Sequence, residues 1–152
     1  MATPKDKPYP RFCAECGNET VVSSHIAYNA EVKHDGRLHE FPISNLTIDK
    51  CQTCGEEYFT VITDHEISNG LRRYLGFLQP EEICEKIHQL GLTEAEFAIR
   101  LGVAKELFSK WITSHTIQNR DMDNLMRVFL GLSGARDLLT ERVASRSDVS
   151  SA

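Results

Sequence analysis

Cysteine spacing is the feature of this sequence that most directly indicates chemistry. Two Cys-x-x-Cys pairs, each followed by glycine, occur as FCAECG at 12–17 and as CQTCG at 51–55. A tight turn of this kind aims two sulfurs at one point, and the glycine lets backbone N–H groups approach the thiolates. The two pairs together predict one closed, tetrahedral site for a single structural Zn²⁺ ion, with the ligands Cys13, Cys16, Cys51 and Cys54.

Three other uses of paired cysteines fit this sequence less well. Disulfides are uncommon in a cytosolic chain, and a redox Cys-x-x-Cys normally opens a helix in a βαβ unit, which neither pair does. A catalytic zinc keeps its fourth position open, whereas four cysteines close the site. The sequence contains no Gly-rich phosphate loop, nucleophile elbow or paired acid motif, so we do not expect an enzyme. The fifth cysteine, Cys84, is expected to be a small buried side chain on a helix.

The chain between the two cysteine pairs must carry structure of its own, because 34 residues separate them. Asp35-Gly36 is a strong hairpin signal, and strand-forming residues flank it within 30–43. Further strands are expected at 46–48, before the second pair, and at 58–62, after it. A small β-sheet is therefore predicted to position the four cysteines.

Helical periodicity begins after this sheet. Asp64 is expected to cap a linker helix, and Pro80 to begin the next helix at its first turn. The start of the chain is rich in Pro and Lys and its end is rich in Ser, as in disordered termini. The predicted organisation is a disordered arm at 1–11, a zinc-binding β domain at 12–63, a helical linker at 64–79, a helical domain at 80–143 and a disordered tail at 144–152.

The segment 92–132 has the pattern of three short helices separated by turns. Thr93 and Glu96 form a capping box, and Gly102 stands where the first helix would end in a left-handed residue. Two short helices joined by such a turn are typical of a helix-turn-helix, whose second helix enters a DNA major groove. A helical hairpin that binds no DNA would bury the same apolar residues, which are Phe97, Ala98, Leu101, Leu107, Phe108 and Trp111.

The remainder of the helical domain completes a bundle of five helices counted from Pro80. A helix starting at Met122 is expected to end at Ser133-Gly134, and a last helix is expected at 135–143. The apolar face predicted for the helix that starts at Met122 consists of Leu125, Val128, Phe129 and Leu132.

Charge is distributed unevenly along a chain whose formal net charge is −5. Residues 1–64 contain 6 Lys/Arg and 10 Asp/Glu, a net charge of −4. Residues 65–152 contain 11 Lys/Arg and 12 Asp/Glu, a net charge of −1. The first part is therefore a poor ligand for nucleic acid and suits a basic protein partner. No window approaches the ~18 apolar residues of a membrane span, and no signal-peptide core is visible, so we expect a cytoplasmic protein.

Several motifs in one order resemble a known family. The two cysteine pairs, LQPEEI, LTEAEFAIRLGV, LFSKW and NRDMDNLMRVF together are similar to the MqsA-type antitoxins, also described as YgiT-type zinc fingers with an Xre-like helix-turn-helix. The similarity extends from about Phe12 to Leu139. It implies an α+β chain, in which a small four-cysteine zinc-binding β-sheet domain precedes an all-α, lambda-repressor-like five-helix domain.

The resemblance also implies function and partners. Members of this family keep zinc for structure, dimerise through the C-terminal helical domain and bind a palindromic operator of their own operon. In toxin–antitoxin pairs the N-terminal domain neutralises an mRNA-cleaving toxin. We therefore expect a transcriptional repressor that is the antitoxin of a type II pair, with double-stranded DNA, a second copy and a basic toxin as partners. A stand-alone regulator, or an interaction module with weakened DNA binding, remains an alternative.

The resemblance places the recognition helix at about Ala104 to Thr113 and two base contacts at Glu106 and Lys110. The family tends to carry Asn and Arg at these two positions. Lysine lacks the bidentate fork that matches guanine, and glutamate can only accept a hydrogen bond from a cytosine amino group. Ala104 replaces a capping serine, at a cost of about 1 kcal/mol. The candidate DNA-contacting residues are Lys105, Glu106, Ser109, Lys110, His115 and Arg120.

Overall fold

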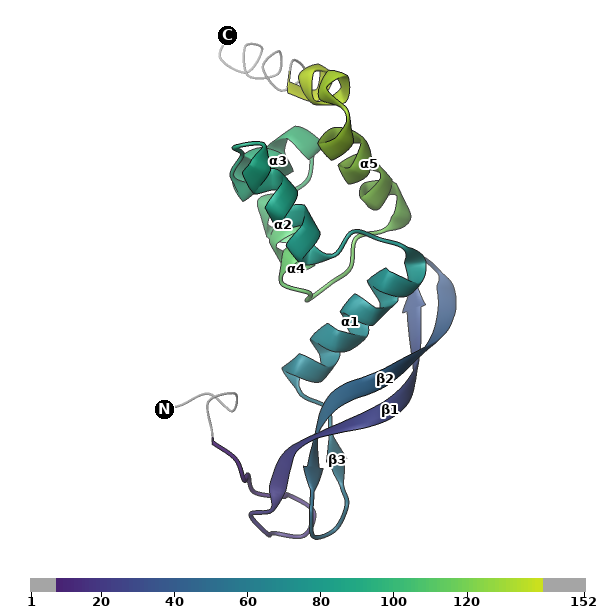
Figure 1. Cartoon of the computed structure of the whole chain (residues 1–152), viewed down its shortest axis with the longest axis vertical. Coiled ribbons are helices and arrows are strands. Elements are labelled where there is room, and N and C mark those ends of the chain that lie inside the picture. The colour runs from purple at the N-terminus through teal and green to yellow at the C-terminus, as the bar shows by residue number, and fades with distance from the viewer. Residues whose placement is uncertain (1–7, 141–152) are drawn as a thin grey trace. The chain divides into compact units, whose positions relative to one another are not determined.

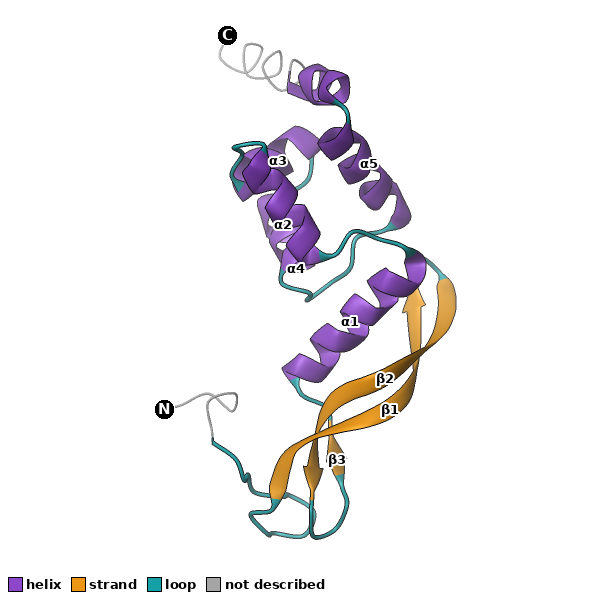
Figure 2. Cartoon of the chain, in the orientation of Figure 1, coloured by secondary structure: helices purple, strands orange, loops and turns teal. Residues whose placement is uncertain are grey.

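The computed structural model describes residues 8–140, which divide into two compact units. Unit 1 contains 8–32 and 38–70, and unit 2 contains 33–37 and 71–140. The strands come first along the chain and the helices follow (Figure 2), which confirms the predicted α+β class. The units divide after Gly70, inside the segment expected to be a helical linker. The expected tail, and the first seven residues of the expected arm, lie outside the described residues.

A three-stranded sheet in the order β1-β2-β3 is the framework of unit 1. The two long strands coil around each other (Figure 1), as two-stranded ribbons with strong twist do. The turn between them is Asp35-Gly36, as predicted, and both residues have positive φ, 51° and 73°. Strand β3 pairs with β2 in antiparallel register, with Asp49 opposite Tyr58. The strands are β1 (Val21–His34), β2 (Arg37–Cys51) and β3 (Glu57–Tyr58).

The strand lengths correct three expectations from the sequence. Strand β1 begins at Val21, nine residues before the expected segment, and its half-buried positions there include Val22, Ile26 and Tyr28. Strand β2 runs without a break to Cys51, so 46–48 is not a separate strand. The strand expected at 58–62 ends at Tyr58 because a helix begins at Val61.

Helix α1 (Val61–Leu75) is capped by Thr60 and not, as expected, by Asp64. The Thr60 N–H donates to Thr63 Oγ1 at 2.9 Å, and the Thr63 N–H donates to Thr60 Oγ1 at 3.4 Å. Asp64 instead lies in the first turn, where a negative charge interacts favourably with the helix dipole. These contacts explain why the helix begins earlier than its apolar periodicity suggested.

Within unit 1, α1 lies against β2 (Figure 1). A Cβ atom at Gly70 would come within 3.1 Å of the Phe41 side chain, so glycine permits this close approach. Side chains of α1 also satisfy the backbone of β2 at Thr47. The Thr47 N–H donates to Glu66 Oε2 at 2.7 Å, and Thr63 Oγ1 donates to the Thr47 carbonyl at 2.6 Å. Helix α1 thereby covers this part of the β2 edge against pairing with another strand.

Unit 2 is built from the end of α1 and from helices that follow Pro80. Helix α3 is capped by Thr93, whose Oγ1 accepts the Glu96 N–H at 3.1 Å, and it ends at Gly102 with φ of 82°, as predicted. A helical segment at 133–140 follows a single irregular residue, Leu132, so the expected break at Ser133-Gly134 is wrong. The labelled helices are α2 (Pro80–Gln89), α3 (Glu94–Leu101), α4 (Lys105–Ile112) and α5 (Arg120–Gly131).

The core of unit 2 is one continuous apolar cluster. The Phe97 ring lies 5.2 Å from both the Phe108 and Phe129 rings, and Trp111 is buried beside Phe108. Leu107, which was expected in this core, is 42% exposed because it lies at the margin of the buried face of α4. The buried cluster is Leu78, Ile83, Ile87, Phe97, Ala98, Leu101, Phe108, Trp111, Met126 and Phe129.

Helix α5 buries only part of the expected face: Phe129 is buried and Leu125 packs against the core. Asp123 is buried and accepts the Leu78 N–H at 2.8 Å, which turns Met126 and Phe129 towards the core. Val128 and Leu132 are consequently exposed.

A buried arginine that the sequence did not single out connects α1 to the turn after α4. Arg72 is fully buried and donates to the Trp111 carbonyl at 2.7 Å, and to Ser114 Oγ and Gln118 Oε1 at 3.1 Å each. Burial lowers the pKa of Arg72 to about 10, so the guanidinium stays charged at neutral pH. These acceptors replace the water that a cation would otherwise retain.

The tip of the β-hairpin belongs to unit 2. His34 Nε2 lies 3.1 Å from the Gln118 carbonyl oxygen, and the Arg120 N–H donates to the Asp35 carboxylate at 3.2 Å. The His34 ring also meets the Phe77 ring edge-on, with 6.1 Å between centroids. The tip is therefore bound to the segment that leads into α5.

Candidate metal centre

The two cysteine pairs form the same turn twice. In the first, the Cys13 N–H donates to the Asn18 carbonyl and the Gly17 N–H donates to the Cys13 carbonyl, both at 2.9 Å. Gly17 has a φ of 79°, a conformation that glycine adopts without strain. The second turn repeats both hydrogen bonds at the same length, with a φ of 80° at its glycine, through Cys51, Gly55 and Glu56.

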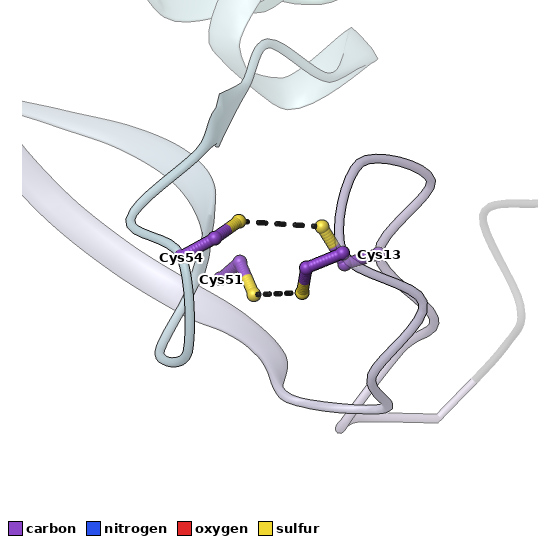
Figure 3. Close-up of side chains that lie close together, drawn as sticks. Cys13, Cys51 and Cys54 are labelled. Atoms are coloured by element: carbon purple, nitrogen blue, oxygen red, sulfur yellow. Dashed lines mark hydrogen bonds between the residues drawn. The ribbon is translucent and has the colours of Figure 1, made fainter.

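The two turns face each other, so the four sulfurs come together (Figure 3). Cys13 Sγ lies 3.7 Å from Cys54 Sγ, and Cys16 Sγ lies 3.6 Å from Cys51 Sγ. All four sulfurs lie within 4.8 Å of one another. Tetrahedral coordination with a metal–sulfur bond of about 2.3 Å requires sulfurs about 3.8 Å apart. The structure thus brings together all four predicted ligands in an arrangement that can hold a metal ion.

Polar groups around the cluster are directed at the sulfurs. Thr20 Oγ1 lies 3.3 Å from Cys51 Sγ, and the Tyr58 hydroxyl lies 3.3 Å from Cys13 Sγ. Asn18 Nδ2 donates to Cys16 Sγ at 3.4 Å. The sequence did not reveal these three residues as part of the site, although each lies on a segment next to a cysteine pair. Hydrogen bonds of this kind orient ligands and stabilise their thiolate form.

The surroundings favour the thiolate forms of Cys13 and Cys51. The Thr20 hydroxyl, together with backbone N–H groups of the turn, lowers the pKa of Cys51 to about 5 against the effect of burial. The Tyr58 hydroxyl and the Cys16 N–H lower the pKa of Cys13 in the same way.

Cys54 behaves oppositely. The Glu56 N–H favours its thiolate, but burial and the neighbouring sulfurs raise its pKa to about 12. Negative charges this close together repel, so a cluster of four thiolates needs a compensating cation. The donor set therefore fits a divalent, thiophilic metal ion.

The DNA-contacting candidates fall into two groups. Lys105, Glu106, Ser109 and Lys110 are all exposed and lie on α4, whose opposite face buries Phe108 and Trp111. Ala104 stands at the N-cap of α4 and makes no side-chain hydrogen bond there, as expected for alanine.

The other two candidates lie beyond α4 and make contacts within unit 2. His115 Nδ1 lies 2.8 Å from Thr113 Oγ1. The Arg120 guanidinium donates to the Leu75 carbonyl at 3.2 Å and lies 4.7 Å from the centroid of the Phe77 ring. Arg120 is therefore engaged in the packing of α1 and the hairpin tip, which sequence spacing could not show.

The chain matches no protein-family model and no curated protein. Between residues 8 and 140, no helix is both long enough and apolar enough to cross a membrane. Cys84 is half-buried on α2 and is not part of the four-sulfur cluster.

Proposed function

We propose that this chain is a zinc-containing helix-turn-helix transcriptional regulator, and more narrowly the antitoxin of a type II toxin–antitoxin pair that represses its own operon. The proposal rests on the motif resemblance and, above all, on the face of α4. This helix buries Phe108 and Trp111 and leaves Lys105, Ser109 and Lys110 exposed. An anchored helix with a polar outer face is what major-groove docking requires.

Zinc is the metal we propose for the four-sulfur cluster. Four cysteines close the coordination shell, so the ion has a structural and not a catalytic role, and the chain is not an enzyme. The Zn²⁺ charge would stabilise the thiolate of Cys54, whose pKa is otherwise raised.

In this proposal α3 and α4, joined through Gly102, form the helix-turn-helix of a five-helix, lambda-repressor-like domain. A homodimer places two copies of α4 in successive major grooves, about one helical turn apart. The exposed apolar residues Val128, Leu132 and Leu138 on α5 and the helical segment that follows supply a surface for such a dimer. A palindromic operator in the promoter of its own gene is the expected DNA, and the cytoplasm is the expected compartment.

The second candidate is an interaction module that keeps this fold but binds DNA weakly. Glu94 and Glu106 place acids on α3 and α4, and Arg120 is already engaged within unit 2. Acids near the phosphates oppose binding electrostatically.

Fluorescence anisotropy with a duplex from the protein's own promoter separates the two candidates. Because Lys110 is expected at a base edge, Lys110→Ala should weaken specific binding by about 1–3 kcal/mol. Lys105→Ala is expected at a phosphate and should reduce the slope of log affinity against log salt by about 1. Lys86→Ala, on the exposed side of α2, is the matched control and should leave both unchanged.

A specific complex that tolerates both α4 substitutions would refute the assignment of α4 as the recognition helix. Absence of any specific complex, in protein that retains its metal, would favour the interaction module.

A further inference from the structure

Unit 1 carries an open apolar hollow at the start of α1. The hollow has a volume of about 530 Å³, and its lining includes Tyr9, Phe59, Val61 and Ile62. All four are exposed, Ile62 by 57%. Side chains of this size rarely gather on a surface without a partner, since each leaves apolar area in water.

The walls of this hollow are held in place by specific contacts. The Tyr9 hydroxyl donates to Asp49 Oδ1 at 2.6 Å, and Arg11 Nη1 donates to Asp49 Oδ2 at 3.2 Å. The Arg11 guanidinium lies 4.1 Å from the centroid of the Tyr9 ring. The Phe59 ring, which also lines the hollow, packs edge-on against the Tyr28 ring with 5.4 Å between centroids. The hollow is therefore formed before any partner arrives, which reduces the entropy lost on binding.

The unit around the hollow is strongly acidic. Among the described residues, unit 1 contains nine Asp/Glu and two Lys/Arg, a formal charge of −7. Unit 2 contains ten Asp/Glu and eleven Lys/Arg, a formal charge of +1. One of the two bases in unit 1, Arg11, is already paired with Asp49. Asp64 lines the hollow itself, and Glu57 lies two residues before Phe59.

We propose that this hollow is the docking site for a basic protein, which inserts an apolar side chain between Phe59 and Ile62 and places Lys or Arg beside the surrounding acids. The inference rests on the proposed function in one respect, that unit 1 binds a protein. The negative charge of unit 1 favours a positively charged partner. A second copy of unit 1, a nucleic acid or an anionic membrane would each bring negative charge to a negative surface. Strand addition at Thr47 is blocked, because Glu66 and Thr63 already bind its backbone.

The test begins with a photo-crosslinking amino acid at Ile62 in the full chain, expressed in its own cells. The crosslinked protein is identified, purified and titrated against the metal-loaded chain. Ile62→Asp should weaken this complex by at least about tenfold, as removal of a central apolar anchor does. An acid at this position favours the first turn of α1, so the variant is expected to fold. Leu38→Asp is the matched control, since Leu38 is 62% exposed in the same unit but does not line the hollow.

A crosslinked partner with a basic isoelectric point, an affinity that falls with salt, and loss of affinity in Ile62→Asp but not in Leu38→Asp would together support the proposal. Crosslinking to a second copy, to an acidic protein or to nothing would overturn it. Equal losses in the two variants would also overturn it. Promoter binding by Ile62→Asp reports separately on the proposed DNA-binding function, which does not depend on the hollow.

Discussion

Unit 1 buries seven apolar side chains among the described residues, and two of these are Cys13 and Cys51 of the four-sulfur cluster. Unit 2 buries twelve, including five aromatic rings. The two units also differ in charge, −7 against +1. One chain thus combines an acidic ribbon with a small core and a nearly neutral helical unit with an ordinary core.

From this difference we infer a role for the cysteine cluster in stabilising unit 1. A domain that buries little apolar area gains too little free energy to offset the entropy of ordering its chain, and metals commonly supply the remainder. Unit 2, which includes the hairpin tip at 33–37, buries a core large enough to need no metal. We therefore expect the two units to respond differently to the same perturbation.

Metal removal should produce the largest difference in stability between the two units. Structural zinc sites contribute about 10–16 kcal/mol in small zinc-binding peptides, so chelation or Cys51→Ser should abolish fixed structure in the sheet of unit 1. Trp111, the single tryptophan, is buried in unit 2, and its fluorescence should stay unchanged. Amide NMR spectra of the full chain measure both units at once.

Cys84→Ser is the control for this experiment, because Cys84 lies outside the four-sulfur cluster. It should retain the metal. A red shift of Trp111 fluorescence on chelation would contradict the independence of the two units.

Loss of the buried arginine should act on unit 2 alone. Arg72→Met removes the buried guanidinium donor to the Trp111 and Thr116 carbonyls, Ser114 Oγ and Gln118 Oε1, and should reduce the free energy of unfolding by on the order of 3–5 kcal/mol. Thermal unfolding followed by Trp111 fluorescence measures the loss. The exposed neighbour provides the comparison, since Arg73→Met should change stability by less than about 0.5 kcal/mol. Loss of metal in the Arg72 variant would show that the arginine also supports unit 1.

The smallest expected effect lies at the start of α4. Ala104→Ser supplies the missing cap and should stabilise unit 2 by about 1 kcal/mol. Thr93→Ala removes the cap of α3 and should destabilise unit 2 by a similar amount. Denaturant unfolding of both variants tests the pair, and the metal content should be the same in each. A serine that gave no stabilisation would mean that another group already satisfies the first turn of α4.

The parts of the fold that local chemistry determines were predictable from the sequence. The hairpin turn at Asp35-Gly36, the cap at Thr93 and the helix end at Gly102 depend on residue type at one position. The start of β1 at Val21 was not predicted, because the polar run at 23–25 interrupts the strand-forming residues there. The exposed positions of Leu107 and Val128 depend on how each helix is rotated in the bundle, which the buried Asp123 helps to fix.

The metal centre was predictable for a similar reason. Cysteine spacing alone identifies four ligands that the structure brings within reach of one ion. The hydroxyl groups of Thr20 and Tyr58 were not predictable, since strand register decides which side chains approach the sulfurs. The engagement of Arg120 was likewise hidden, because it depends on the distant Leu75 and Phe77.

The hairpin tip at 33–37 makes unit 2 discontinuous along the chain. A fragment that begins at residue 71 would lack His34 and Asp35, and with them the contacts to Gln118 and to the start of α5. Genetic recombination that transferred only the helical part of the chain would therefore transfer an incomplete unit 2. During synthesis, unit 2 also cannot be completed until its last helices meet a turn that left the ribosome much earlier.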